Sequence, residues 1–249
     1  MVHPLVRYSH SSDRIIRDNM RITSRKSLYL AISITFILSG LFYFLPIDQI
    51  VVHWSYQQGF FRSAPLLTIT RITRMINIII VLITLLCLAK ALYQKNKTLT
   101  RQCIFLCVCW IITSAVITPI LKTTFSRTRP MYTMHYGGSN HFQKIWQIGN
   151  ECKSNCSFIS DEATIAFSFI AFLFLIKKSR RRHQVAAAVV CYYIFVSIIR
   201  MLIGKHFLSD VVMAGCLTFI ETWIIYAAFN QFSLTKLTVS SDHDYNRNL

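Results

Sequence analysis

Six long apolar runs limit the folds that this chain of 249 residues can adopt. They cover residues 27–45, 75–93, 103–121, 158–176, 185–203 and 211–229. Each run is close to the length of about 20 residues that an α-helix needs to cross the hydrocarbon core of a bilayer. Only 15% of the residues are charged, which is too few to cover the surface of a soluble domain of this size. The sequence therefore predicts an all-α polytopic membrane protein with six transmembrane helices.

The fourth run is the weakest of the six predicted spans, because it carries Asp161 and Glu162 near its start. The first 26 residues are polar and basic, and no small-residue cleavage site follows the first apolar run. We therefore expect that run to be retained as a span. The predicted organisation is a basic tail at 1–26, one membrane domain at 27–230 and a second tail at 231–249.

Lys and Arg are unevenly distributed among the tails and the connections between the runs. The net charge is +17, and Lys and Arg concentrate in the N-terminal tail, in the connection between the second and third runs, and in the block KKSRRR at 177–182, with two more in the C-terminal tail. An excess of Lys and Arg marks the cytoplasmic side of a membrane protein. Both termini are therefore expected in the cytoplasm, and three connections are expected outside: 46–74, 122–157 and 204–210. A basic block between two spans is better explained by topology than by nucleic-acid binding, so no nucleic-acid partner is expected.

The cysteines divide between the spans and one outer connection. Six of the eight lie in apolar runs. Three of these, Cys103, Cys107 and Cys109, approximate one helical face, but no His or acid in that run completes a metal site. Neither a metal nor another cofactor is expected. Cys152 and Cys156 lie in the expected outer connection. A disulfide between them would suit an oxidising compartment, but the short spacing imposes tight geometry, and the sequence leaves this pairing open.

The first of three polar clusters directly follows the third apolar run. The stretch LKTTFSRTRP, residues 121–130, places Lys122, Arg127 and Arg129 on the side where the charge rule calls for no cations. Pro130 then prevents the helix from continuing. A single lysine at a helix end would be explained by a side chain that reaches the lipid headgroups. The presence of two further clusters on the same side favours anion binding.

The second cluster, CSFISDEA at residues 156–163, opens the fourth run. Ser157 or Ser160 can cap a helix here, and an acid favours the positive end of the helix dipole. Capping explains one carboxylate, but Asp161 and Glu162 are two. A charge costs about 2.5–3.5 kcal/mol at the centre of a bilayer and less near its surface, so the second carboxylate indicates a functional role.

The third cluster is SIIRMLIGKHFLSD, residues 197–210. Arg200 ends the fifth run, Gly204 permits a tight turn, and His206 lies four residues before Asp210. This spacing puts the imidazole and the carboxylate on one helix face. A carboxylate bonded to one ring nitrogen fixes the tautomer and leaves the other nitrogen free to attack.

Together the clusters provide cations, a nucleophile with its orienting acid, and a separate proton donor on one outer surface. This set fits phosphoryl transfer through a phosphohistidine, because cations neutralise the charge that spreads over the phosphoryl oxygens in the transition state.

Two of the clusters resemble signatures of the PAP2 lipid phosphatases, which are relatives of the vanadium haloperoxidases. Lys122, six further residues and then Arg129-Pro130 resemble the first signature. Arg200, His206 and Asp210, separated by five and three residues, resemble the third. The middle signature of the family is Pro-Ser-Gly-His, and the aligned residues here are Ile159, Ser160, Asp161 and Glu162. The resemblance covers roughly residues 27–230 and implies a PAP2/haloperoxidase-like helical core.

The resemblance implies a role for each matching residue. The phosphate-binding residues would be Lys122, Arg129, Arg200 and Ser160. His206 would be the nucleophile and Asp210 the acid that orients it. The branch that the sequence resembles most is the lipid A 4′-phosphatases, on the run His-Phe-x-Ser-Asp-Val-Val at 206–212 and on Thr222-Trp223. That branch carries an acidic residue where the middle signature has histidine.

Glu162 is accordingly the expected proton donor to the leaving oxygen. It must be protonated near neutral pH, well above the ordinary glutamate pKa of about 4.3. A half-buried position beside a phosphate dianion would raise the pKa, whereas the nearby cations would lower it, and the sequence does not decide between them. Asp161 replaces the glycine of the family and would repel phosphate unless its side chain points away. His135 and His141 in the outer connection are alternative donors.

The expected substrate is a lipid phosphate at the headgroup plane. The long connection at 131–157 is expected to lie as a lid over the headgroup or to serve only as an interfacial anchor. By resemblance we expect a metal-independent phosphatase of the bacterial inner membrane. It would remove a phosphate from lipid A, the 4′ more than the 1, on the periplasmic face, and so confer resistance to cationic antimicrobial peptides. The alternatives are undecaprenyl diphosphate or phosphatidylglycerophosphate as the substrate, or a non-catalytic phospholipid-binding protein. The oligomeric state stays open.

Overall fold

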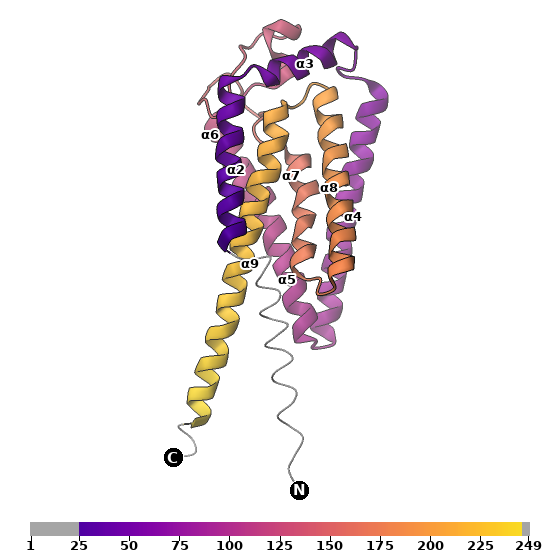
Figure 1. Cartoon of the computed structure of the whole chain (residues 1–249). Coiled ribbons are helices and arrows are strands. Elements are labelled where there is room, and N and C mark those ends of the chain that lie inside the picture. Colours follow the sequence, from indigo (N-terminus) through magenta and orange to yellow (C-terminus); the bar gives the residue numbers. More distant parts are fainter. Residues whose placement is uncertain (1–24, 246–249) are drawn as a thin grey trace.

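The computed structural model describes residues 25–245, with side chains to residue 230. Long helices run side by side, and one short helix lies across the end of the bundle (Figure 1). No strand occurs within the described residues. The α-helices are α2 (Arg25–Phe44), α3 (Ile47–Gln57), α4 (Ala64–Tyr93), α5 (Lys97–Ile111), α6 (Thr118–Phe125), α7 (Asp161–Ser168), α8 (Ser179–Leu202) and α9 (Leu208–Tyr245). The all-helical prediction is confirmed.

Five helical segments are long and apolar enough to cross a membrane, and they match five of the six predicted runs. The fourth run instead forms the short helix α7, which continues as the 3₁₀ helix η5 (Phe169–Phe174). Together these cover about 24 Å, less than the about 30 Å of a hydrocarbon core. In Figure 1, α7 lies between α8 and α9, and it also contacts α4 and α5. Its surroundings are protein on most sides, which is where a span that carries charge is tolerated.

The third run is one continuous helical segment that changes its winding twice. After α5, a π-helical turn, η2 (Ile112–Ile117), leads into α6. Pro119 cannot donate the hydrogen bond that an α-helix requires at its position. The wider turn lets the Thr118 hydroxyl donate to the Thr113 carbonyl oxygen, at 2.8 Å. Such a turn re-aims the last helical turn, which carries Lys122.

Two connections differ from the prediction. The predicted outer connection 46–74 contains α3, which lies across the end of the bundle (Figure 1). Its last eleven residues belong to α4, which begins at Ala64 and not at residue 75. The error arose because Arg71 and Arg74 interrupt the apolar pattern there. Helix α9 continues to Tyr245, past the expected end of the membrane domain, while residues 1–24 and 246–249 of the expected tails lie outside the described residues.

Candidate active site

The turn between α8 and α9 carries the predicted nucleophile. Helix α8 ends at Leu202, and Gly204 has a φ of +71°, a left-handed conformation that favours glycine. The ring of Phe61 would also lie 2.8 Å from a Cβ at this position, so a larger residue cannot fit without a shift. The turn brings His206 back toward Arg200, whose Nη2 lies 3.2 Å from His206 Nε2.

Hydrogen bonds to both nitrogens define the tautomer of His206. The imidazole is fully buried, and its Nδ1 lies 2.8 Å from the carbonyl oxygen of Ser157, which can only accept. The proton therefore sits on Nδ1, and the lone pair of Nε2 faces the guanidinium of Arg200. Burial, together with the positive charges of Arg200, Lys122 and Arg129, lowers the pKa of His206 to about 3. The ring is neutral, as a nucleophile must be.

Asp210 does not orient His206 in the way the sequence predicts. Its Oδ2 lies 3.8 Å from His206 Nδ1, beyond hydrogen-bonding distance. Asp210 accepts instead from the backbone N–H of Phe207, at 2.8 Å, and from the hydroxyl of Ser157. The carboxylate thus holds Ser157, and the carbonyl of Ser157 holds the imidazole. A backbone oxygen carries no side-chain signature, so the sequence could not reveal it.

The predicted phosphate-binding cations gather near His206. Lys122 donates to the carbonyl oxygen of Cys156 at 2.6 Å, and Arg129 Nε donates to that of Asn155 at 2.7 Å. Arg200 is 2% exposed, and within the described part of the chain its Nε and Nη1 have no hydrogen-bond partner. Buried donors are nearly always paired. Two unpaired nitrogens on one guanidinium therefore indicate a place for an anion.

The middle cluster opens α7. The Ser160 hydroxyl caps this helix by accepting from the backbone N–H of Ala163, so its expected bond to phosphate competes with a structural bond. Glu162 is buried between two guanidinium groups: its Oε1 lies 2.6 Å from Arg74 Nη2, and its Oε2 lies 2.9 Å from Arg200 Nη2. Two such neighbours favour the charged carboxylate. Asp161 is more exposed and lies 3.1 Å from Lys122 Nζ, so it turns toward a cation and not into the middle of the site.

A buried ion pair behind the nucleophile was not among the predicted site residues. Arg127 Nη1 lies 2.6 Å from Asp210 Oδ1, and its Nη2 lies 2.8 Å from Asp48 Oδ2, on α3. Its Nε donates to the carbonyl oxygen of Gln143, and its guanidinium carbon lies 4.2 Å from the centre of the Phe207 ring. Arg127 stands in the LKTTFSRTRP stretch, and Asp48 is the only acid in residues 46–74. Nothing in the sequence shows that these two charges are buried or that they meet.

Comparison with known proteins adds the family. A family model described as PAP2 superfamily matches residues 102–233, more than half of the chain. The chain belongs to the PAP2 superfamily. Two proteins named lipid A 4′-phosphatase, from Francisella tularensis subsp. novicida and from Rhizobium leguminosarum, are 32% and 34% identical to it. These matches cover 59% and 53% of this chain, and 67% and 52% of the relatives, so the chain spans only about half the length of the Rhizobium protein.

A solved structure agrees with the fold. The PAP2 type phosphatidylglycerolphosphate phosphatase from Bacillus subtilis superposes with a TM-score of 0.56, over 82% of this chain and 94% of that one. At 15% identity it supports the fold alone. The family model and the two relatives confirm the expected family and the enzyme class, a phosphatase. The solved structure confirms the helical membrane fold.

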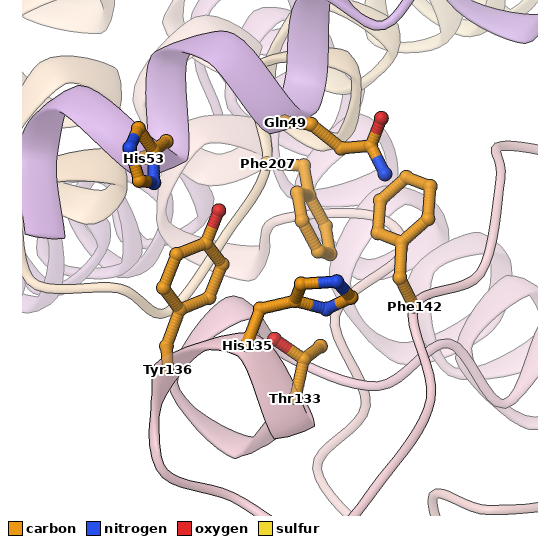
Figure 2. A pocket seen from close by; sticks show the side chains of 7 residues that line it. All are labelled: Gln49, His53, Thr133, His135, Tyr136, Phe142 and Phe207. Atoms are coloured by element: carbon orange, nitrogen blue, oxygen red, sulfur yellow. The ribbon is translucent and has the colours of Figure 1, made fainter.

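The long connection of this PAP2 protein packs against α3 and encloses a second pocket. Figure 2 shows this pocket between α3 and the short helix η4 (Met134–Tyr136), with Phe207 at its centre. The pocket measures about 210 Å³ and is lined by Gln49, His53, Thr133, His135, Tyr136, Phe142 and Phe207. His135 lies in this pocket, and His141 pairs with Glu151 at 2.6 Å. Within the described residues, neither alternative proton donor forms a hydrogen bond or ion pair with the cations around His206.

The two outer cysteines form a disulfide, which the sequence left open. The bridge joins Cys152 and Cys156 and encloses Asn155. The backbone oxygens of Cys156 and Asn155 are the acceptors for Lys122 and Arg129. The bridge therefore constrains the segment that positions two cations of the PAP2 site. The six remaining cysteines are free.

Proposed function

We propose that this PAP2 protein removes a phosphate from lipid A, the 4′ more than the 1, through a phosphohistidine intermediate. The observation that carries the proposal is the pair of unpartnered Arg200 nitrogens beside the neutral imidazole of His206. Lys122 and Arg129 lie close enough to lower the pKa of the ring, so they add positive charge to the site. The names of the relatives supply the substrate, because both are lipid A 4′-phosphatases.

In the proposed first step, His206 Nε2 forms a bond to phosphorus as the bond from phosphorus to the sugar oxygen breaks. Arg200 must move off Nε2 to meet the phosphate oxygens, which offer its nitrogens the acceptors that they lack. The developing charge on the oxygens is stabilised by Lys122, Arg129 and Arg200. In the second step a water oxygen attacks phosphorus, the N–P bond breaks, and inorganic phosphate leaves with Nε2 restored.

The leaving sugar oxygen needs a proton, and we assign its delivery to Glu162. In the resting protein Glu162 is flanked by Arg74 and Arg200, which favour its charged form. An arriving phosphate dianion competes for Arg200 and brings negative charge close to the carboxylate, and both changes favour uptake of a proton.

The proposed location is the bacterial inner membrane, with the site on the periplasmic face and both termini in the cytoplasm. Support comes from the distribution of Lys and Arg among the connections and from the disulfide beside the site, which suits an oxidising compartment. Loss of a phosphate would make the cell surface less anionic, and resistance to cationic antimicrobial peptides is the expected consequence.

The test is release of inorganic phosphate from lipid A by the purified protein in detergent with a metal chelator present. Mass spectrometry of the product should show loss of the 4′-phosphate. His206→Ala should abolish release, whereas His53→Ala, in the second pocket, should retain it. A folded native protein that binds lipid A but releases no phosphate would support the non-catalytic alternative. If inorganic phosphate were released faster from undecaprenyl diphosphate or phosphatidylglycerophosphate than from lipid A, that lipid would replace lipid A as the proposed substrate.

A further inference from the structure

Arg74 is a cation of the site that lies outside all three sequence clusters. It is on α4, and its Nη2 lies 2.6 Å from Glu162 Oε1. The contacts continue from Glu162 Oε2 to Arg200 at 2.9 Å and from Arg200 to His206 at 3.2 Å. Four residues from three helices and the α8–α9 turn thus form one chain of polar contacts that ends at the nucleophile.

Exposure separates Arg74 from the other cations. Its side chain is 58% exposed, compared with 3% for Arg200 and 12% for Lys122. Arg74 is therefore the point at which the buried cation cluster reaches the surface of the bundle. An anionic group that approaches along this surface of α4 would meet Arg74 before it met Arg200.

Apart from Arg71 on the preceding turn, the surface around Arg74 is apolar. Ile72, Met75 and Ile78, all within about one turn, are exposed. The 30 residues of α4 extend over about 45 Å, so the helix exceeds the hydrocarbon core by about 15 Å. Arg74 directly precedes the apolar run 75–89, in which no residue is charged, so it lies near the edge of the hydrocarbon region on the side of the site. An arginine there is stabilised by an anion, and lipid phosphates occupy that level.

We propose that Arg74 is a phosphate-capturing residue, which binds Glu162 in the resting protein and exchanges it for the phosphate monoester of an entering lipid. The exchange frees the Oε1 side of Glu162 as the phosphate passes to Arg200. This inference rests on the proposed function, and it adds to the phosphate-binding residues one that none of the three sequence clusters contains. Arg74 would touch the substrate, so it acts on binding first and on turnover second.

The competing explanation is that Arg74 only positions Glu162. Both roles predict some loss when the arginine is removed, so a single variant does not separate them. They differ in a protein that already lacks the carboxylate. If Arg74 binds phosphate directly, it still contributes to affinity when Glu162 is replaced. If it acts only through Glu162, it contributes nothing more.

The test therefore measures phosphate affinity in a double-mutant cycle. The probe is inorganic phosphate, titrated against the full-length protein in detergent, and affinity is read from the rise in unfolding temperature with phosphate concentration. Arg74→Gln should weaken affinity roughly tenfold or more, as expected for the loss of one charge-assisted hydrogen bond. Arg74→Lys should recover part of the loss. Arg71→Gln removes the same charge from the preceding turn of α4 and should have little effect.

Glu162→Gln should tighten phosphate binding, because it releases both Arg74 and Arg200. Adding Arg74→Gln to Glu162→Gln should again weaken affinity roughly tenfold. No further weakening in the double variant, or an equal loss from Arg71→Gln, would overturn the inference. In lipid A turnover, Arg74→Gln should raise KM more than it lowers kcat. The binding titration needs no turnover, so a protein that shows this pattern yet releases no phosphate would refute the proposed function and leave the role of Arg74 standing.

Discussion

Two buried arginines contact the His206–Asp210 segment, Arg127 through Asp210 and Arg200 through His206, and their surroundings differ. Arg127 has a partner for each nitrogen of its guanidinium: Asp48, Asp210 and the carbonyl of Gln143. Arg200 has Glu162 and the imidazole of His206 on one nitrogen, while its other two have no partner within the described residues. Both side chains are almost wholly buried. The difference shows which arginine completes the fold and which one is kept ready for an anion.

The physical reason is the cost of burying charge. A buried guanidinium is tolerated when carboxylates and carbonyls satisfy it, and removal of one partner leaves the others uncompensated. Arg127 has reached this satisfied state without any ligand. Arg200 has not, so part of its desolvation cost would be recovered only when an anion binds. The site therefore gives up stability at Arg200 and gains binding strength there.

The largest expected effect is the loss of stability in Arg127→Gln. The variant leaves Asp48 and Asp210 as buried carboxylates without their cation, and breaking a buried ion pair costs about 3–5 kcal/mol. Thermal unfolding in detergent should show a much lower midpoint than the native protein. The conservative Arg127→Lys keeps the charge but not the fork of donors, and it should fall between the two. A midpoint unchanged in Arg127→Gln would contradict the structural role given to this arginine.

Arg200→Gln should show the opposite pattern. Phosphate release should fall roughly 10²–10³-fold, the loss that follows removal of one donor to transition-state charge. The unfolding midpoint should fall much less than in Arg127→Gln, because Glu162 keeps its ion pair with Arg74 and two nitrogens of the native guanidinium are unsatisfied. Activity and unfolding are measured on the same preparation. A drop in stability as large as that of Arg127→Gln would show that the two arginines are equivalent and would remove the contrast between them.

The sequence predicted five of the spans correctly because they depend on long apolar runs, which a bilayer requires, whereas the fourth predicted run forms only the short helices α7 and η5. It predicted Lys122, Arg129, Arg200 and His206 because charged residues beside apolar runs stand out. It missed the beginning of α4, where Arg71 and Arg74 break the apolar pattern but leave the helix intact. Because the span was predicted to begin at residue 75, Arg74 was assigned to a connection and was not recognised as a site residue. It lies on helix α4 and pairs with Glu162.

The sequence also misplaced the partner of His206. An i, i+4 spacing brings His206 and Asp210 near each other, but it does not decide which atom is closest. The Ser157 carbonyl takes the hydrogen bond because residues 157–160 come before α7 and leave their backbone groups free for tertiary contacts. Arg127 and Asp48 lie far apart in the chain, and only folding shows that they meet.

The last expected effect concerns acid, and it sharpens the contrast between the two arginines. The pKa of His206 is about 3 in the folded protein, because the ring is buried beside Arg200, Lys122 and Arg129, against about 6.5 when unfolded. Between these values the unfolded chain binds a proton that the folded chain does not, so stability falls as the pH drops from about 6.5 towards 3.

Unfolding midpoints measured from pH 8 to pH 4 should fall less steeply for His206→Gln than for the native protein. Arg200→Gln removes a positive charge beside the ring, so it should also make the unfolding midpoint depend less on pH. Inorganic phosphate places negative charge beside the ring and should have the same effect. Equal slopes in the native protein and His206→Gln would mean that the surroundings of the imidazole do not keep it neutral. The contrast between Arg127 and Arg200 would then have no effect on the protonation of the nucleophile.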